Sequence, residues 1–258
     1  MAKKLRLTTR DRLILEHIHQ FNLSTPRILK GEYFEDKKMA AVDSTTRRLR
    51  KHGLITSHQI DGSRRVYYRL TPEGGRTINQ DVKPDVFGCF KFFRSYAMLH
   101  FICLRSPSVE RVKCSPTMLS RLIVDNGMQF PRIDFYMAEN KHQRDNSLTT
   151  SLGMAIADMR SKHRRLVQRC VKHSRNFIQR GWFVDVMKAG RFEITVLTGS
   201  ESKKKDLELS VPRELRRQLR RDILKHGLES PIRFPIKFKV EVIPELDEIV
   251  PFRKKREK

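Results

Sequence analysis

The sequence predicts a protein of mixed α and β structure in two parts, a small domain of helices with one hairpin and a larger α/β domain with a central sheet. Apolar residues recur at helical spacing over residues 9–54, and the pattern changes to that of short strands near residue 55. Strands and helices then alternate over residues 108–243, which is typical of an α/β domain. A chain of 258 residues is long enough for two domains of this kind.

The charge of the chain indicates a polyanionic partner. Lys and Arg number 54 against 29 Asp and Glu, which gives a formal net charge of +25. So large an excess costs stability through self-repulsion and exceeds what solubility requires. Residues 1–78 carry a net +9 and the remainder +16, so both parts are able to meet a polyanion. Nucleic acid is the commonest such partner, although ribosomal and membrane-surface proteins share this balance.

Other features narrow the class of protein. No stretch approaches the roughly 20 apolar residues of a membrane span, and no apolar core follows the basic N-terminus, so we expect a cytoplasmic, nucleoid-associated protein. The four cysteines lack CxxC spacing and suit a reducing compartment. Two i,i+3 pairs could present zinc ligands, His100 with Cys103 and Cys170 with His173, but buried thiols and solvated histidines are the favoured interpretation. We therefore expect neither a metal nor a cofactor.

Three helices are predicted before residue 55. Thr8 or Thr9 caps the first, which Asn22 ends, and a cap residue followed by a proline begins a short second helix over residues 24–34. The third covers residues 39–55 and turns three apolar residues inward, with a glycine as its stop. Those apolar residues are Val42, Leu49 and Leu54.

A hairpin and a last helix complete the first part. Residues 56–60 and 66–70 read as two short strands around Asp61-Gly62, a dipeptide typical of hairpin turns. Thr71 and Pro72 then begin a helix.

The run RRLRKHGLI (47–55), the hairpin and YYRLTPEGG (67–75) together resemble the winged helix-turn-helix domains of bacterial and archaeal DNA-binding proteins. The resemblance implies a domain over residues 1–80 whose third helix lies in the major groove of double-stranded DNA. Ser44, Thr45 and Arg48 would face bases or nearby phosphates. Other basic residues would contact the DNA backbone or, at the hairpin tip, the minor groove; they are Arg47, Arg50, Lys51, Arg64 and Arg65. The alternative is a domain kept for protein contacts, with solvated arginines.

After a linker at residues 79–86, a mixed α/β domain is predicted over residues 87–251, with a basic tail at 252–258 that we expect to be disordered when unbound and attracted to DNA non-specifically. Its predicted helices cover residues 87–105, 116–127, 148–180 and 212–227, the last after a loop with Lys203, Lys204 and Lys205. Its predicted strands cover residues 108–115, 128–140, 182–187, 191–199 and 232–243.

The long helix followed by RFEITVLTGSESKKKDLELS (191–210) resembles the replication-relaxation family of plasmids and other mobile elements. That resemblance implies a second domain like that of restriction endonucleases, possible in degenerate form. It also implies a role in replication or transfer of a mobile element, beside the role of transcriptional regulator that a winged helix allows.

A nuclease of that fold needs an Asp on one strand and a Glu-x-Lys on the next, to hold a divalent metal. Asp134, Glu139 and Lys141 supply these residue types, but the spacing puts the two carboxylates on opposite faces of one strand. We find no Walker loop, HUH-type histidine pair, Ser/His/Asp order or tyrosine recombinase set. The sequence therefore favours a domain without catalysis, and a metal-dependent nuclease stays the alternative.

The second domain is expected to widen the contact with DNA or to form a homodimer. Its helix over residues 212–227 offers five arginines for phosphate contacts, although the helix could merely cover the sheet. These are Arg213, Arg216, Arg217, Arg220 and Arg221. The prediction is a sequence-specific double-stranded DNA-binding protein that is not an enzyme, with RNA binding as a further alternative that only the charge favours.

Overall fold

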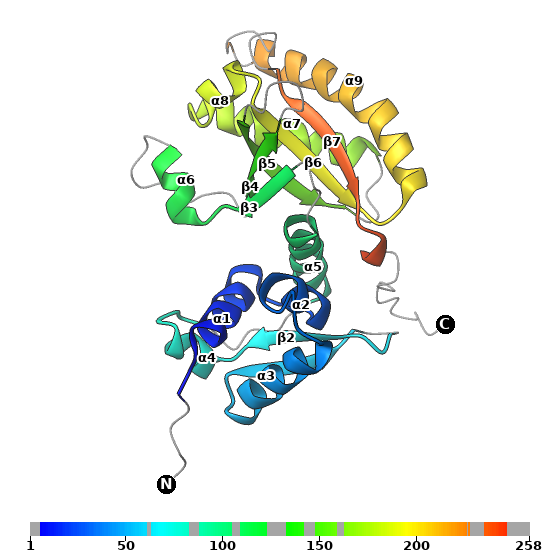
Figure 1. The fold of residues 1–258 in the computed structure, drawn as a ribbon. Helices are drawn as coiled ribbons and strands as arrows, with labels where there is room; N and C mark the ends of the chain where they lie inside the picture. The colour runs from blue at the N-terminus through cyan, green and yellow to red at the C-terminus, as the bar shows by residue number, and fades with distance from the viewer. Residues whose placement is uncertain are drawn as a thin grey trace, which may run out of the picture. The chain divides into compact units, whose positions relative to one another are not determined.

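The computed structural model describes residues 6–60, 63–82, 88–104, 109–122, 133–141, 148–158, 163–225, 227 and 235–246. Over the described residues the chain divides into two compact units, which span 6–104 and 109–246. Helices combine with one sheet of two strands and one of five, so the predicted mixed α and β class is confirmed (Figure 1).

The first unit begins with three helices, then has two strands and two further helices. The elements are α1 (Thr9–Phe21), α2 (Pro26–Tyr33), α3 (Met39–Lys51), β1 (Ile55–Gln59), β2 (Val66–Leu70), α4 (Pro72–Thr77) and α5 (Cys89–Cys103). Local signals place their starts: Thr8 closes a capping box at α1, while Thr25 and Thr71 cap α2 and α4 in front of prolines.

The two strands of this unit are antiparallel, with Ile55 opposite Leu70 and Gln59 opposite Val66. The segment between α1 and α2 joins them, because Ser24 forms a bridge with Tyr68. Asp61 and Gly62, on which the predicted turn depended, lie outside the described residues. The hairpin is thus tied to the helices on its β2 side.

The core of the first unit is built from the apolar faces of its helices. Val42, Leu49 and Leu54 are buried, as the sequence predicted. They pack with residues of α1, α2 and the strands, including Ile14, Leu15, Ile18, Leu29, Ile55 and Leu70.

Helix α5 is grouped with this unit, whereas the sequence placed it at the start of the second domain. Its Phe92 ring lies 4.9 Å from the ring of Tyr67 on β2, and Tyr96 follows one turn later against Phe92. A contact between residues 25 positions apart leaves no local signal in the sequence. Composition alone therefore did not show to which unit α5 belongs.

His17 is a buried titratable group on α1, with 5% of its surface exposed. Its Nε2 lies 3.1 Å from the Ser24 hydroxyl, and its ring packs on those of Phe21 and Tyr33. Burial lowers the pKa of His17 to about 4.

We expect acid to weaken the first unit through His17. A histidine in the unfolded chain has a pKa of about 6.5. Between roughly pH 6.5 and pH 4, His17 therefore binds a proton in the unfolded chain but stays neutral in the folded chain. The contribution is therefore complete above pH 6.5 and is lost as the pH falls, at about 1.4 kcal/mol per pH unit. Urea unfolding of the wild type and of His17→Phe at pH 7 and pH 5 measures it. The wild type should lose more stability than the variant, and equal losses would show that folding does not lower the pKa of His17.

The second unit contains a five-stranded sheet in the order β3-β4-β5-β6-β7. The strands are β3 (Val109–Lys113), β4 (Asp134–Lys141), β5 (Leu148–Ala157), β6 (Phe192–Thr198) and β7 (Lys237–Val242). The pairs β3–β4 and β4–β5 are antiparallel, whereas β5–β6 and β6–β7 are parallel. Between them lie α6 (Pro116–Leu122), α7 (His163–Gln179), α8 (Val184–Lys188) and α9 (Glu201–Lys225), and a 3-10 turn (Pro244–Leu246) follows β7.

The two faces of this sheet differ in polarity. On β6, Ile194 and Val196 join an apolar cluster that includes residues of α7 and α9, so both helices cover that face. Glu193 and Thr195 alternate with them and lie on the opposite face. All seven residues of β6 are buried, as expected for a central strand covered on both sides.

The predicted helix over residues 148–180 is wrong in its first third, which is strand β5. Residues 151–156 are all buried, so the apolar run has no polar face from which a period could be read. A short run of this kind fits a buried strand and a buried helix equally well. Only α7 corresponds to the prediction.

Two further segments were also predicted wrongly. Residues 182–187, predicted as a strand, overlap α8 instead: the buried Phe183 precedes the helix as its N-cap, and Met187 is buried within it. The loop predicted around Lys203–Lys205 lies in the first two turns of α9, and Pro212, predicted as the start of this helix, lies inside it. A proline is tolerated there because Val211, Leu215 and other apolar residues hold the helix to the core.

Candidate nucleic-acid interface

One face of helix α3 packs into the core of the first unit. Val42, Thr46 and Leu49 are buried, and the Thr46 hydroxyl donates to the Tyr68 hydroxyl at 3.3 Å. The opposite face therefore points to solvent. Ser44, Arg47 and Lys51 are exposed along it at spacings of three and four residues, which places them in one row.

The exposed basic residues of α3, in this row and beside it, keep their charges available. Arg47, Arg50 and Lys51 are exposed, and within the described part of the chain none of them forms an ion pair. Thr45 is half-buried beside them, and Asp43 is the acidic residue exposed on the same helix. The predicted contact residues of α3 are thus brought together on one surface, with the exception of Arg48.

Arg48 contacts α1 instead. Its Nη2 donates to Asp11 Oδ1 at 2.6 Å, and the Asp11 side chain is 1% exposed while that of Arg48 is 37% exposed. Burial raises the pKa of Asp11, but hydrogen bonds from Arg48 and Thr8 outweigh it and hold that pKa below its usual range. The sequence placed Arg48 toward the bases or nearby phosphates; in the structure it links α3 to α1.

The hairpin carries two exposed arginines at its tip, Arg64 and Arg65. The tip is held by backbone contacts: Ile60 N–H donates to the Arg65 carbonyl at 2.8 Å, and the Gln59 side chain donates to the Ser63 carbonyl at 2.7 Å. These contacts leave both guanidinium groups at the surface.

The five predicted arginines of α9 are all exposed, on the side opposite its buried leucines. They are Arg213, Arg216, Arg217, Arg220 and Arg221. Arg217 also pairs with Glu214 at 2.6 Å, and hydrogen bonds from Arg217 and Gln218 lower the pKa of Glu214. The basic tail at residues 252–258 lies outside the described residues.

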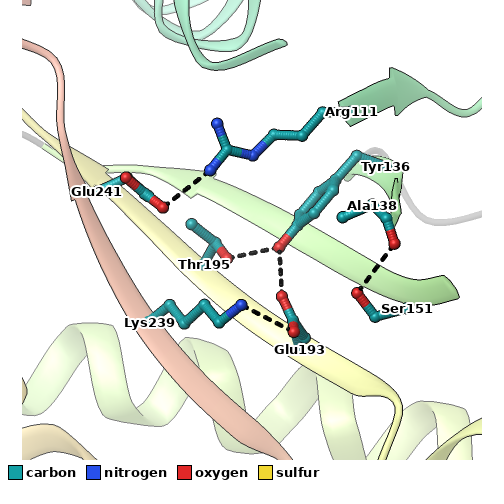
Figure 2. A network of polar contacts seen from close by, with 8 residues as sticks. All are labelled: Arg111, Tyr136, Ala138, Ser151, Glu193, Thr195, Lys239 and Glu241. Carbon is teal, nitrogen blue, oxygen red and sulfur yellow. Dashed lines mark hydrogen bonds and ion pairs between the residues drawn. The ribbon is translucent and has the colours of Figure 1, made fainter. Parts of the chain in front are cut away.

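A polar network on the second sheet was missed by sequence reasoning (Figure 2). The Tyr136 hydroxyl lies 2.6 Å from Thr195 Oγ1 and donates to Glu193 at 3.2 Å, while Lys239 donates to the same carboxylate at 2.9 Å. Arg111 donates to Glu241 at 3.0 Å beside them. Each of these carboxylates is therefore matched by a cation.

Burial, with the charge of Glu193, raises the pKa of Tyr136, so the phenol stays protonated. The network pairs the carboxylates of this sheet face with cations and gives its buried hydroxyls hydrogen-bond partners, as buried polar groups require. The signal that could have found it is Glu193, an acid inside an apolar strand.

The candidate nuclease residues are not arranged as a metal site. Asp134 and Glu139 lie on the continuous strand β4, opposite Ala155 and Thr150 of β5. An odd separation puts them on opposite faces, Asp134 lies 3.8 Å from Lys113, and Glu139 is exposed. Lys141 occupies the last position of β4, and its side chain lies outside the described residues. Over those residues, no group of three or more His, Cys, Asp or Glu side chains could hold a metal ion.

The histidine and cysteine pairs lie in different units. His100 and Cys103 belong to α5, and Cys170 and His173 to α7. Cys170 is fully buried, and this burial raises its pKa to about 12. Such a thiol is inert and serves packing.

Among the described helices, none combines the length and the apolar character that crossing a bilayer requires.

Comparison with known proteins gives one likeness. No family model and no curated protein matches this chain. The structure of a double mutant of ZitR from Lactococcus lactis is similar over 39% of this chain and 57% of that one, with 20% identity and a TM-score of 0.26. A TM-score this low does not place the chain in a fold family.

Proposed function

We propose that the chain is a sequence-specific double-stranded DNA-binding protein whose first unit is a winged helix-turn-helix. Its order of three helices, a hairpin and a helix, with the Ser24–Tyr68 bridge beside the hairpin, is compatible with that fold. The observation that carries the proposal is the outer row of α3, where Ser44, Arg47 and Lys51 are exposed on a helix otherwise packed into the core. A row of this kind suits a helix that enters the major groove.

The proposal divides the residues by role. Ser44 and Thr45, in the middle of α3, contact base edges and determine the sequence read. Arg47, Arg50 and Lys51 on α3, with Arg64 and Arg65 at the hairpin, contact phosphates or the minor groove and position the protein. Arg48 positions α3 through Asp11 and acts only indirectly.

The second unit assists DNA binding in this proposal, and catalysis has no part in it. The separation of Asp134 from Glu139 on two faces of β4 supports this view, as does the pairing of Glu193 and Glu241 with cations. Incubating the protein and duplex DNA with Mg²⁺ or Mn²⁺ should leave the DNA intact on a denaturing gel. Cleavage that Asp134→Ala abolishes would instead establish a metal-dependent nuclease.

Transcriptional regulation and an accessory role in replication or transfer of a mobile element are the two uses that fit such a protein. Selecting the bound sequence from a random pool decides between them, since a promoter and a replication or transfer origin are different targets. A homodimer would show itself as two half-sites in the selected DNA.

The α3 assignment is tested by anisotropy binding to selected and random duplexes across a salt series. Arg47→Gln with Arg50→Gln should weaken binding to both duplexes and reduce the log–log salt slope by about 0.9 per lost phosphate contact. Ser44→Ala should reduce the preference for the selected duplex by about 1–3 kcal/mol with an unchanged slope.

The matched control removes two exposed charges from other helices of the same unit, Arg76→Gln on α4 with Lys91→Gln on α5. If this control loses as much DNA affinity as the α3 pair, the loss reflects the net charge of the protein alone. That result would overturn the assignment of α3.

A further inference from the structure

The basic charge of the second unit is concentrated on two helices. Helix α7 contains five Lys and Arg and no Asp or Glu. Helix α9 is divided: residues 201–211 carry three Lys against three acids, whereas residues 212–225 carry six Lys and Arg against two acids, a net of +4. Only one end of α9 is therefore strongly positive.

The structure sets α7 beside that positive end. Each helix connects parallel strands, β5 to β6 and β6 to β7, so the two helices run in the same direction. The His163 ring nitrogen Nδ1 lies 2.7 Å from the Ser210 hydroxyl, so the first residue of α7 is level with the middle of α9. From there α7 accompanies the basic part of α9.

Six cations of the two helices are exposed on their outer faces. Leu166, Cys170 and Phe177 of α7 and Leu215 and Leu219 of α9 are buried in the shared core, which fixes the inner faces. The outer faces expose Arg164, Arg165, Lys172, Arg213, Arg220 and Arg221.

None of these six has an ion pair within the described residues. Nearby cations are partly engaged, Arg169 with Asp158 at 3.8 Å and Arg217 with Glu214. Unpaired charges gathered on one surface repel each other, and a polyanion relieves that repulsion.

We infer that α7 and the second half of α9 form one surface, here called the α7/α9 surface, that binds the phosphate backbone of duplex DNA without reading its sequence. The inference rests on the proposed function and adds α7 to it as a contact element. The α7/α9 surface lies in the unit that does not contain α3, so it supplies phosphate contacts beyond those of the winged helix.

The dimensions fit a duplex. Arg213 and Arg221 are eight residues apart, about 12 Å along the helix axis. One DNA strand carries a charge about every 3.4 Å of duplex length, so this row faces three to four phosphates. Packed helices lie about 8–10 Å apart, which sets the row of α7 alongside as a second line of positive charge.

The test uses the full chain and a short labelled duplex pool of random sequence, in anisotropy titrations across a salt series. Arg165→Gln with Lys172→Gln on α7 should reduce the log–log salt slope by up to about 1.8, since two phosphate contacts are lost. Affinities for random and selected duplexes should fall by the same factor. Arg213→Gln with Arg220→Gln on α9 should act in the same way, and far-UV circular dichroism checks that all variants are folded.

The matched control removes two exposed charges elsewhere in the same unit, Arg121→Gln on α6 with Lys188→Gln on α8. It should leave the slope near that of the wild type. A slope in the α7 pair equal to that of this control would overturn the inference, as would a loss confined to the selected duplex. Tighter binding of single-stranded RNA than of duplex, lost in the α7 pair, would assign the surface to RNA and also overturn it.

The result separates this inference from the proposed function. If the α3 pair of variants weakens binding and the α7 pair does not, the winged-helix proposal stands and the α7/α9 surface is rejected. If the α7 pair weakens binding and the α3 pair does not, duplex binding resides in the second unit and the role given to α3 is rejected.

Discussion

Replacing Gly153 by alanine is expected to destabilise the second unit by about 3 kcal/mol, the upper end for overpacking a core. Gly153 lies on β5 directly opposite Tyr136 of β4. A Cβ at this position would lie 2.2 Å from the tyrosine ring. The ring cannot move aside easily, because it is buried and its hydroxyl is held by Thr195 and Glu193.

Urea unfolding followed by tryptophan fluorescence measures this effect, since Trp182 is the single tryptophan and lies in the core of the same unit. Gly31→Ala on α2 is the matched control, as its new methyl group would meet nothing within 4 Å. Circular dichroism should show the control to be at least as stable as the wild type, because alanine is favoured over glycine within a helix. Adding Tyr136→Leu to Gly153→Ala should cost less than the sum of the two changes, and strict additivity would contradict the clash.

Arg48→Ala is expected to destabilise the first unit by about 2 kcal/mol, whereas Arg47→Ala one residue earlier should leave its stability unchanged. The first change leaves the carboxylate of Asp11 buried without its cation, and loss of one partner of a fully buried pair costs about 3–5 kcal/mol. Solvent around the half-exposed guanidinium of Arg48 reduces that cost. Arg47 has no such partner.

The order of the two variants should be reversed in DNA binding, where Arg47→Ala has the larger effect. At a temperature where both are folded, Arg47→Ala should weaken binding and reduce the salt slope by about 0.9, while Arg48→Ala should bind almost as the wild type does. Thermal unfolding and anisotropy on the same samples give both quantities. A fully stable Arg48→Ala that binds DNA poorly would return Arg48 to the DNA contact that the sequence predicted for it.

The elements of the first unit could be predicted because their signals are local. Thr8, Thr25 and Thr71 begin helices through bonds to residues three positions ahead, and the helical spacing of apolar residues reaches no further than one turn. The exposure of Arg47, Arg50 and Lys51 follows from the same periodicity, once Val42 and Leu49 are placed inward.

The features that could not be predicted depend on contacts between residues far apart in the sequence. The different roles of Arg48 and Arg47 depend on the ion pair of Arg48 with Asp11, which lies 37 positions away. Likewise, Glu193 pairs with Lys239, which lies 46 positions further along the chain. Strand β5 was taken for a helix because residues 151–156 are buried on both faces of the sheet and so show no alternation of polar and apolar side chains. Pattern therefore predicted which α3 charges are exposed, but it predicted neither the ion pair nor the network.

The parallel pairing of β5, β6 and β7 also bears on how the chain folds. Leu152 pairs with Phe192, and Glu193 with Lys237, each at least 40 residues apart, whereas β1 and β2 of the first unit are joined by a short connection. Contacts that close long loops form slowly, and those between near neighbours form fast. During synthesis the first unit also emerges first. The elements α1 to α5 are therefore expected to form while the last parallel strand is still awaited, so a chain stalled before β7 would already carry the exposed residues of α3.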